Sequence, residues 1–222
     1  MRQVAVNGAE GLLRASVHAE LRRRFVTGKV VPGRGLSTRG LAHELGVSQM
    51  PVREALSRLA AEGAVEIRSK RRVIVPPMTA ARFADLLRCR ELLEPDAAAA
   101  ALPHIDAARL RRLRAADDAL GDALQSGDVE RYMECNFEFH FLIYGAQPRP
   151  MMNRLIEILW LQFGPHMRVV YGRFGTANLV DQHQRALRAI RARSAARLRA
   201  AILADIRDGM ALIRRSGFEA GE

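Results

Sequence analysis

The amino-acid sequence predicts a mostly α-helical chain of two domains, with one short β-hairpin at the end of the first. Ala, Leu and Arg, which favour helices over sheet, dominate its composition. Hydrophobic residues recur at three- and four-residue steps along most of the chain, and a two-residue period follows only Gly63. The 222 residues, 49% of them hydrophobic, are enough for two modest domains with a core each.

The first predicted element is an amphipathic helix over residues 12–27, which ends near Gly28. Its apolar face carries hydrophobic residues at four-residue steps, Leu13, Val17, Leu21 and Phe25. The segment 30–37 contains one Pro and two Gly and therefore predicts a turn.

Two short helices with a tight turn between them follow. Ser37 is placed to cap the first helix, which stops at Gly46, and Ser48 is placed to cap the second, which stops at Gly63. Pro51 falls in the first turn of the second helix, where a missing N–H has no cost. The pair predicts a helix-turn-helix.

A β-hairpin is predicted after these helices. Val65 and Ile67 alternate with polar neighbours, and the apolar residues 73–75 supply the second strand. The tip carries four basic side chains, Arg68, Lys70, Arg71 and Arg72. Because a hairpin beside a helix-turn-helix is a wing, we expect a winged helix-turn-helix domain over residues 10–76.

The sequence after Met78 is predicted to be helical throughout and to form a second domain over residues 80–217. The expected helices cover 79–102, 106–125, 128–146, 149–173, 178–193 and 194–215. Pro95 lies inside the first of them and is expected to kink it.

Composition also narrows the class of protein. No apolar run approaches the roughly 20 residues needed to cross a bilayer, and the N-terminus does not look like a secretory signal. The two cysteines, Cys89 and Cys135, lie in helical patterns. We expect them to be apolar fillers of a reduced, cytoplasmic protein rather than a disulfide framework.

The charge of the chain is unevenly distributed. The net charge is +11, and residues 1–77 carry 14 Lys and Arg against 6 Asp and Glu. This placement fits a first domain that meets a polyanion. An Arg-rich composition with solvated faces is the alternative explanation.

The second helix of the pair has the features of a DNA recognition helix. Such a helix brings its first residues to base edges in the major groove, with basic groups near the flanking phosphates. Ser48 and Gln49 can donate to a phosphate or a base edge, and Arg53 lies one turn on, placed to bind guanine. Arg39 points the same way from the preceding helix. The alternative is an unrelated helical hairpin in which Gln49 and Arg53 are solvated.

The segment GLSTRGLAHELGVSQMPVREALSRLAAEGAVEI carries a more specific signal. Together with the Pro-Gly turn before it, it resembles the winged helix of the GntR family over residues 32–67. The resemblance implies operator contacts from Arg39, Gln49 and Arg53 and from the wing.

Two positions depart from the family pattern. Gln49 stands where many members have Arg, which predicts a different operator sequence. Lys70 and Arg71 fill a tip where members usually carry glycine, which favours phosphate contact over insertion into the minor groove. The residues expected to contact DNA are Arg39, Ser48, Gln49, Arg53, Arg68, Lys70 and Arg71.

The C-terminal part resembles the FadR-type effector domain, called FCD, over roughly residues 80–216. The matching segments are FADLLRCRELLEPDAAAAA, NFEFHFLIYGA, DQHQRALRAI and AARLRAAILADI, in the order and spacing of the family. The resemblance implies an antiparallel helical bundle around a polar cavity, often with a divalent metal, that binds small organic acids.

Four residues are candidate ligands for such a metal, zinc or nickel for example. Asn136 and His140 lie four apart on one helical face, and His183 and Asp205 lie on two later helices of the bundle. The family usually has Asp at the first position and His at the last, and an amide oxygen is a weaker ligand than a carboxylate. The alternative is a pair of core histidines satisfied by hydrogen bonds.

Two arginines are candidates for binding a carboxylate effector. Arg90 lies one turn before Glu94, so it forms an intrahelical ion pair or faces the cavity and binds the carboxylate bidentately. Arg168 is either a second anion ligand or a surface residue. His104 and His166 match no family position and are expected at the surface or at helix ends.

These features predict a ligand-responsive transcription regulator, not an enzyme. We expect a repressor that binds palindromic operator DNA as a homodimer and responds to a small organic acid. One alternative is a metal-dependent hydrolase that uses His140, His183 and Asp205, with Glu134 or Glu138 as base. It lacks a nucleophile motif and leaves the basic first domain unexplained. The other alternative is a non-specific nucleoid-binding protein.

Overall fold

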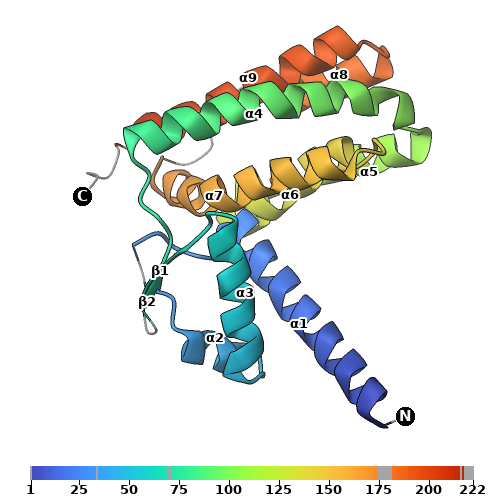
Figure 1. Ribbon diagram of the computed structural model, residues 1–222. Helices are drawn as coiled ribbons and strands as arrows, with labels where there is room; N and C mark the ends of the chain where they lie inside the picture. The colour runs from blue at the N-terminus through green and yellow to red at the C-terminus, as the bar shows by residue number, and fades with distance from the viewer. Residues whose placement is uncertain (1, 34, 70–71, 175–181, 216, 218–222) are drawn as a thin grey trace.

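A computed structural model describes residues 2–33, 35–69, 72–174, 182–215 and 217, and the side chains of 2–11 and 170–174 lie outside this description. Figure 1 shows a small N-terminal domain, α1 to β2, below a larger helical domain. The predicted fold class, a mostly helical chain with one small hairpin, is confirmed.

The N-terminal domain is a helix-turn-helix with an additional long first helix and a hairpin. Its elements are α1 (Arg2–Val26), α2 (Thr38–Glu44), α3 (Gln49–Ala61), β1 (Glu66–Ser69) and β2 (Arg72–Ile74). The predicted start of the first helix at residue 12 is wrong, because α1 begins at Arg2 and runs through Gly8. Gly8 and Gly11 each cost the helix only about 1 kcal/mol and do not end it. Leu21 and Phe25 of α1 are fully buried in the core that α3 also enters.

The two strands form the predicted wing. They pair antiparallel, with Ile67 opposite Val73, and the Leu36 N–H donates to the Val73 carbonyl at 2.7 Å. Val73 and Ile74 are buried, whereas β1 is exposed along its length. The wing therefore attaches to the domain through β2.

The second domain consists of helices joined by short connections. They are α4 (Ala80–Ala101), the 3-10 helix η1 (Leu102–His104), α5 (Ala107–Ser126), α6 (Val129–Tyr144), α7 (Pro150–Phe174), α8 (Gln182–Arg191) and α9 (Ala195–Arg215). The predicted helices are confirmed, with ends that differ by a few residues, and 178–181 lies outside the described residues. Thr79, Asp106 and Asp128 cap α4, α5 and α6 by accepting from a backbone N–H three residues on.

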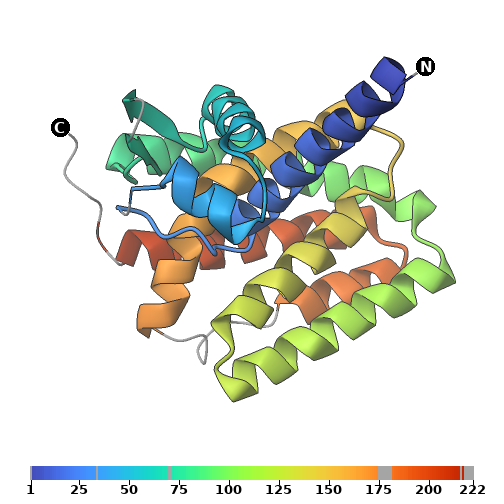
Figure 2. The same ribbon diagram turned by 90° about the horizontal axis from the view of Figure 1, so that it is seen from below.

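The helices of the second domain pack in pairs, α4 along α9 and α5 along α6, with α8 against α9 (Figure 1). Seen from below, α1 crosses in front of α7 (Figure 2), and the contact between these two helices joins the two domains. Cys89 and Cys135 are free thiols. The described helices include none that is long and apolar enough to cross a membrane.

The end of α1 approaches α7 at backbone distance through two glycines. A Cβ on Gly164 would lie 2.5 Å from the carbonyl oxygen of Phe25 and 3.0 Å from that of Val26. Gly28 has a φ of +68°, and a Cβ there would lie 2.5 Å from the Cβ of Arg168. Larger residues at either position would force the domains apart.

Candidate functional site

Helix α3 has one buried and one exposed face. The buried face carries Pro51, Val52, Ala55, Leu56 and Leu59. The opposite face presents Gln49 and Arg53 to solvent, and Arg39 is exposed on α2. The residues predicted to read base edges therefore lie on a free surface.

The two serines predicted as helix caps behave differently. The Ser37 hydroxyl accepts from the Gly40 N–H at 3.1 Å and caps α2. Ser48 occupies the cap position of α3, but its side chain makes no capping bond. The exposed Ser48 hydroxyl is thus available beside Gln49 for a partner outside the chain.

The wing contributes two described cations, Arg68 and Arg72, both exposed. Arg68 is exposed on β1, and its Nε lies 3.4 Å from Glu66 Oε2. Lys70 and Arg71, the predicted tip cations, lie outside the described residues.

The sequence reasoning missed Met50. Its side chain is 58% exposed in the first turn of α3, on the same face as Gln49 and Arg53. An apolar side chain at such a position can contact a thymine methyl group. The signal was an apolar residue on the polar face of an otherwise amphipathic helix.

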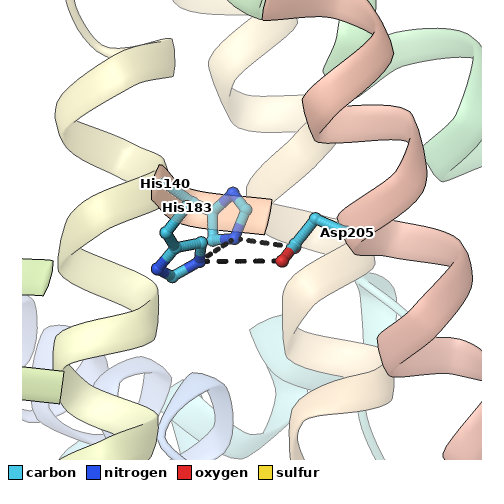
Figure 3. A group of neighbouring side chains, drawn as sticks. All are labelled: His140, His183 and Asp205. Atoms are coloured by element: carbon cyan, nitrogen blue, oxygen red, sulfur yellow. Dashed lines mark hydrogen bonds and ion pairs between the residues drawn. The ribbon is translucent and has the colours of Figure 1, made fainter. Parts of the chain in front are cut away.

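Three of the four predicted metal ligands converge inside the second domain. His140 on α6, His183 on α8 and Asp205 on α9 point toward one another (Figure 3). Nε2 of His140 lies 3.1 Å from Asp205 Oδ2 and 3.4 Å from Nε2 of His183, which lies 3.7 Å from Asp205 Oδ1. Both imidazoles are buried. Asn136, half-buried, lies one turn before His140 on α6.

The outer hydrogen bond of His140 fixes where its proton lies. The Tyr144 hydroxyl donates its one proton to Glu94, with Oη and Oε2 2.8 Å apart. Tyr144 Oη therefore accepts from Nδ1 of His140, 3.0 Å away. Because a neutral imidazole carries one N–H, Nε2 of His140 bears a lone pair.

The same argument applies to His183. Its Nδ1 lies 3.2 Å from Asp117 Oδ1, a carboxylate oxygen that only accepts, so Nε2 again bears a lone pair. Two bare nitrogens and the Asp205 carboxylate thus face one point, which is a donor set that fits a divalent cation. Their separations suit ligands that each lie about 2.0–2.2 Å from a common ion.

The carboxylate of this group is held ionised. Burial alone raises the pKa of Asp205, but in the state in which the two rings are protonated the charge and hydrogen bond of His140, then the charge of His183, and also the charge of Arg90, outweigh it. Together they lower the pKa of Asp205 to about 2.

Behind the cluster lies a buried ion pair. Arg90 Nε lies 2.5 Å from Glu94 Oε1, so the intrahelical pair is the arrangement found. Glu94 also accepts from Tyr144 and from the Trp160 indole N–H at 3.2 Å. The Arg90 guanidinium carbon lies 3.8 Å from the centre of the Phe163 ring. The charge of Arg90 is therefore matched within the protein.

His166 and Arg168 lie where α7 meets the N-terminal domain. The expectation of a surface or helix-end position for His166 is wrong, because its side chain is buried and bonds to the Pro76 backbone. Burial, then the charge of Arg82, lowers the pKa of His166 to about 4. Arg168 is half-buried and packs against Gly28. Its role as an effector ligand stays a prediction.

A cavity of about 400 Å³ adjoins the cluster. His183 and Asp117 form part of its wall, together with residues of α5, α6 and α8. The described lining includes three aspartates, Asp117, Asp118 and Asp122, and no Lys or Arg. A ligand in this cavity would meet no Lys or Arg side chain among the described residues.

The two carboxylates proposed as the base of a hydrolase lie elsewhere. Glu134 pairs with Arg23 at 2.8 Å and with Lys29 at 3.4 Å, at the end of α1. Glu138 is exposed on α6. Neither belongs to the group of possible metal ligands that the described residues form.

Comparison with known families agrees with this two-part structure. Residues 13–75 match the bacterial regulatory proteins of the gntR family, and residues 85–208 match the FCD domain. The second match alone covers more than half of the chain.

Individual relatives are transcription regulators. The chain is 30% identical to the HTH-type transcriptional regulator McbR of Escherichia coli over 184 residues, which are 82% of this chain and 83% of that protein. It is 28% identical to the HTH-type transcriptional regulator LutR of Bacillus subtilis, over 81% of this chain and 91% of LutR.

Solved structures show the same fold. The structure of E. coli McbR/YncC covers 92% of this chain and 98% of its own, with a TM-score of 0.86 and 28% identity. A putative GntR regulator from Rhodococcus sp. RHA1 shares the fold with a TM-score of 0.72 at 22% identity, covering 91% and 98%. The chain therefore belongs to the GntR family and is a transcription regulator with an FCD domain, not an enzyme.

Proposed function

We propose that this protein is a homodimeric repressor that reads palindromic operator DNA with α3. When the FCD domain binds a small molecule, the dimer leaves the operator or changes its arrangement on the DNA. The observation that carries the DNA-reading part is the free surface made by Arg39, Gln49 and Arg53. Arg53 is placed for a bidentate contact with guanine, and Ser48 for a phosphate or base edge. Arg68, Lys70 and Arg71 of the wing would contact phosphate. Two such heads would read two half-sites one or more DNA turns apart.

The ligand-binding part depends on the converging lone pairs of the cluster. His140, His183 and Asp205 would hold a divalent metal such as zinc or nickel, with Asn136 as a weaker fourth ligand. The metal would supply an anchor for the carboxylate of an organic acid in the adjoining cavity. Because Arg90 is paired with Glu94, its charge would act on such an anion through space rather than by contact.

Regulation requires that the ligand bind one arrangement of the dimer better than another. The linker at 76–80 joins the two domains, so a shift in the packing of the second domain would change the spacing of the heads. Repression is the direction we propose, since occupancy of an operator by a ligand-free dimer blocks transcription.

The test is the affinity of the Arg53→Ala variant for an operator selected from random DNA with the wild-type protein. We expect a loss of about 1–3 kcal/mol and a relaxed base preference at one position of each half-site. The matched control is Arg114→Ala, which removes an exposed arginine from α5. Unchanged binding by Arg53→Ala would show that α3 does not read the operator in this way. A wild-type protein that selects no sequence would instead be a non-specific nucleoid-binding protein.

A further inference from the structure

Side chains of the second domain contact the C-terminal end of the recognition helix and both ends of the wing. Gln162 of α7 donates to the Glu62 carbonyl at 3.0 Å, and Arg82 of α4 donates to the Gly63 carbonyl at 2.8 Å. These carbonyls directly follow α3. At the other end of the hairpin, His166 of α7 bonds to the Pro76 backbone.

Arg82 and Gln162 also bind each other. Arg82 Nη2, which donates to the Gly63 carbonyl, also donates to Gln162 Oε1 at 2.8 Å. A Cβ on Gly63, whose φ is +72°, would lie 3.1 Å from Gln162 Nε2, so the fit around the end of α3 is close. The Glu62 side chain adds ion pairs with Arg22 and, at 3.4 Å, with Arg154. The end of the recognition helix is thus fixed by its backbone and by its last side chain.

Helix α7 also touches the network behind the cluster, on a neighbouring face. Trp160 and Phe163 face Arg90 and Glu94, whereas Gln162 and His166, one turn apart, face the N-terminal domain. Helix α4 also contacts both regions. Its Glu94 belongs to the network behind the cluster, and its Arg82, three turns earlier, contacts the N-terminal domain.

These contacts form an unbroken path from the cluster to α3. His140 bonds to Tyr144, and Tyr144 and Trp160 bond to the same oxygen of Glu94. Trp160 and Gln162 lie two residues apart on α7, so a shift of the helix at Trp160 also moves Gln162. A change in the position of His140 therefore alters a carboxylate that α4 and α7 share.

We infer that Arg82 and Gln162 are positioning residues that set the orientation of the recognition helix and transmit the state of the cluster to it. This inference rests on the proposed function, because it names the contacts through which that regulation acts. A coupling of this kind changes affinity by roughly 5- to 150-fold. Coupling between the cluster and the recognition helix is measured directly by the experiment below.

The test uses the full-length Gln162→Leu variant, which keeps the volume of the side chain and removes both of its hydrogen bonds. The first readout is the ratio of affinities for the selected operator and for a copy with one extra base pair between its half-sites. Wild-type protein should discriminate strongly, and Gln162→Leu should lose at least about 5-fold of that discrimination. The control is Arg149→Ala, which removes an exposed charge just before α7.

The second readout is the response of operator affinity to zinc. Zinc should shift the affinity of the wild-type protein, whereas Gln162→Leu should bind zinc equally well by calorimetry and show no shift. If Gln162→Leu fails to fold, Gln162→Glu serves instead, because it keeps the acceptor for Arg82 and loses the donor to Glu62.

The outcomes separate the inference from the proposed function. If Gln162→Leu discriminates between the two operator spacings as well as the wild type does, the positioning role is overturned, whether or not zinc changes the affinity. A wild-type protein that ignores zinc contradicts the metal part of the proposed function, and the spacing ratio still decides the role of Gln162. Lost discrimination with a retained zinc response supports positioning and overturns transmission through this contact.

Discussion

The Nε2 atoms of His140 and His183 lie 3.4 Å apart, and no hydrogen bond can join them while both rings are neutral. In each neutral ring the proton is on the outer nitrogen, Nδ1, which donates to Tyr144 in His140 and to Asp117 in His183. Either a cation sits between the rings and Asp205, or one ring is protonated. In the first case, the hydrogen-bond partners of Nδ1 affect how tightly the cation is bound.

Asp117→Asn tests the first case. Loss of an outer carboxylate partner weakens the basicity and orientation of a ligating histidine, and such changes typically reduce metal affinity about 10- to 100-fold. We expect that reduction for zinc in a chelator-competition titration. Asp118→Asn, an exposed neighbour that lines the same cavity, is the control and should bind zinc like the wild type. Equal zinc affinity of both variants would mean that His183 is not a ligand.

Glu94→Gln should be among the most destabilising polar substitutions in the second domain. It leaves the buried Arg90 without its counter-charge, and breaking a buried pair in this way costs about 3–5 kcal/mol. Urea unfolding measures the cost. Glu91→Gln on the same helix breaks ion pairs with the exposed Arg88 and Arg207, for which we expect less than about 1 kcal/mol. Comparable costs for the two variants would show that the pair is solvated in solution.

The pKa of His166 predicts a pH dependence of stability. The native pKa of about 4 lies below the ordinary value of 6.5, so between these values the unfolded chain binds a proton that the native protein does not. Stability attributable to His166 is therefore full above pH 6.5 and falls as the pH drops toward 4, by about 3 kcal/mol in total. Unfolding free energies of the wild type and His166→Gln should diverge over that window. Those of the exposed His104→Gln should follow the wild type.

Gly164→Ala should weaken the contact between the domains. The added methyl group meets backbone oxygens of α1 that cannot move independently, and overpacking of this kind costs about 1–3 kcal/mol. Gly121→Ala on α5 is the control, since a Cβ there meets nothing within 4 Å. It should stabilise the protein by up to about 1 kcal/mol through helix propensity. Thermal unfolding of both variants decides the matter, and a neutral Gly164→Ala would show that α1 and α7 separate readily.

The helices, the turn and the wing followed from periodicity and from residues with strong local preferences, such as Ser37 and Pro51. Such signals are encoded within a few residues of one another, so one sequence is enough to find them. The approach of His140 to His183 depended on resemblance to a family, because nothing local indicates which of many helical faces will meet.

The surroundings of these residues could not be predicted. Glu94 reads as half of an ordinary helical ion pair, and its other donors, Tyr144 and Trp160, come from helices 50 and 66 residues away. The position of His166 was predicted wrongly for the same reason, since its backbone partner, Pro76, lies 90 residues away at the end of the wing.

The glycine contact between α1 and α7 bears on how regulators of this kind can be recombined. A DNA-reading half taken from another protein would pack on this effector half only if a glycine also followed its first helix at the position of Gly28. The two halves are therefore not freely exchangeable modules, because a larger residue at Gly28 or Gly164 would push the end of α1 away from α7.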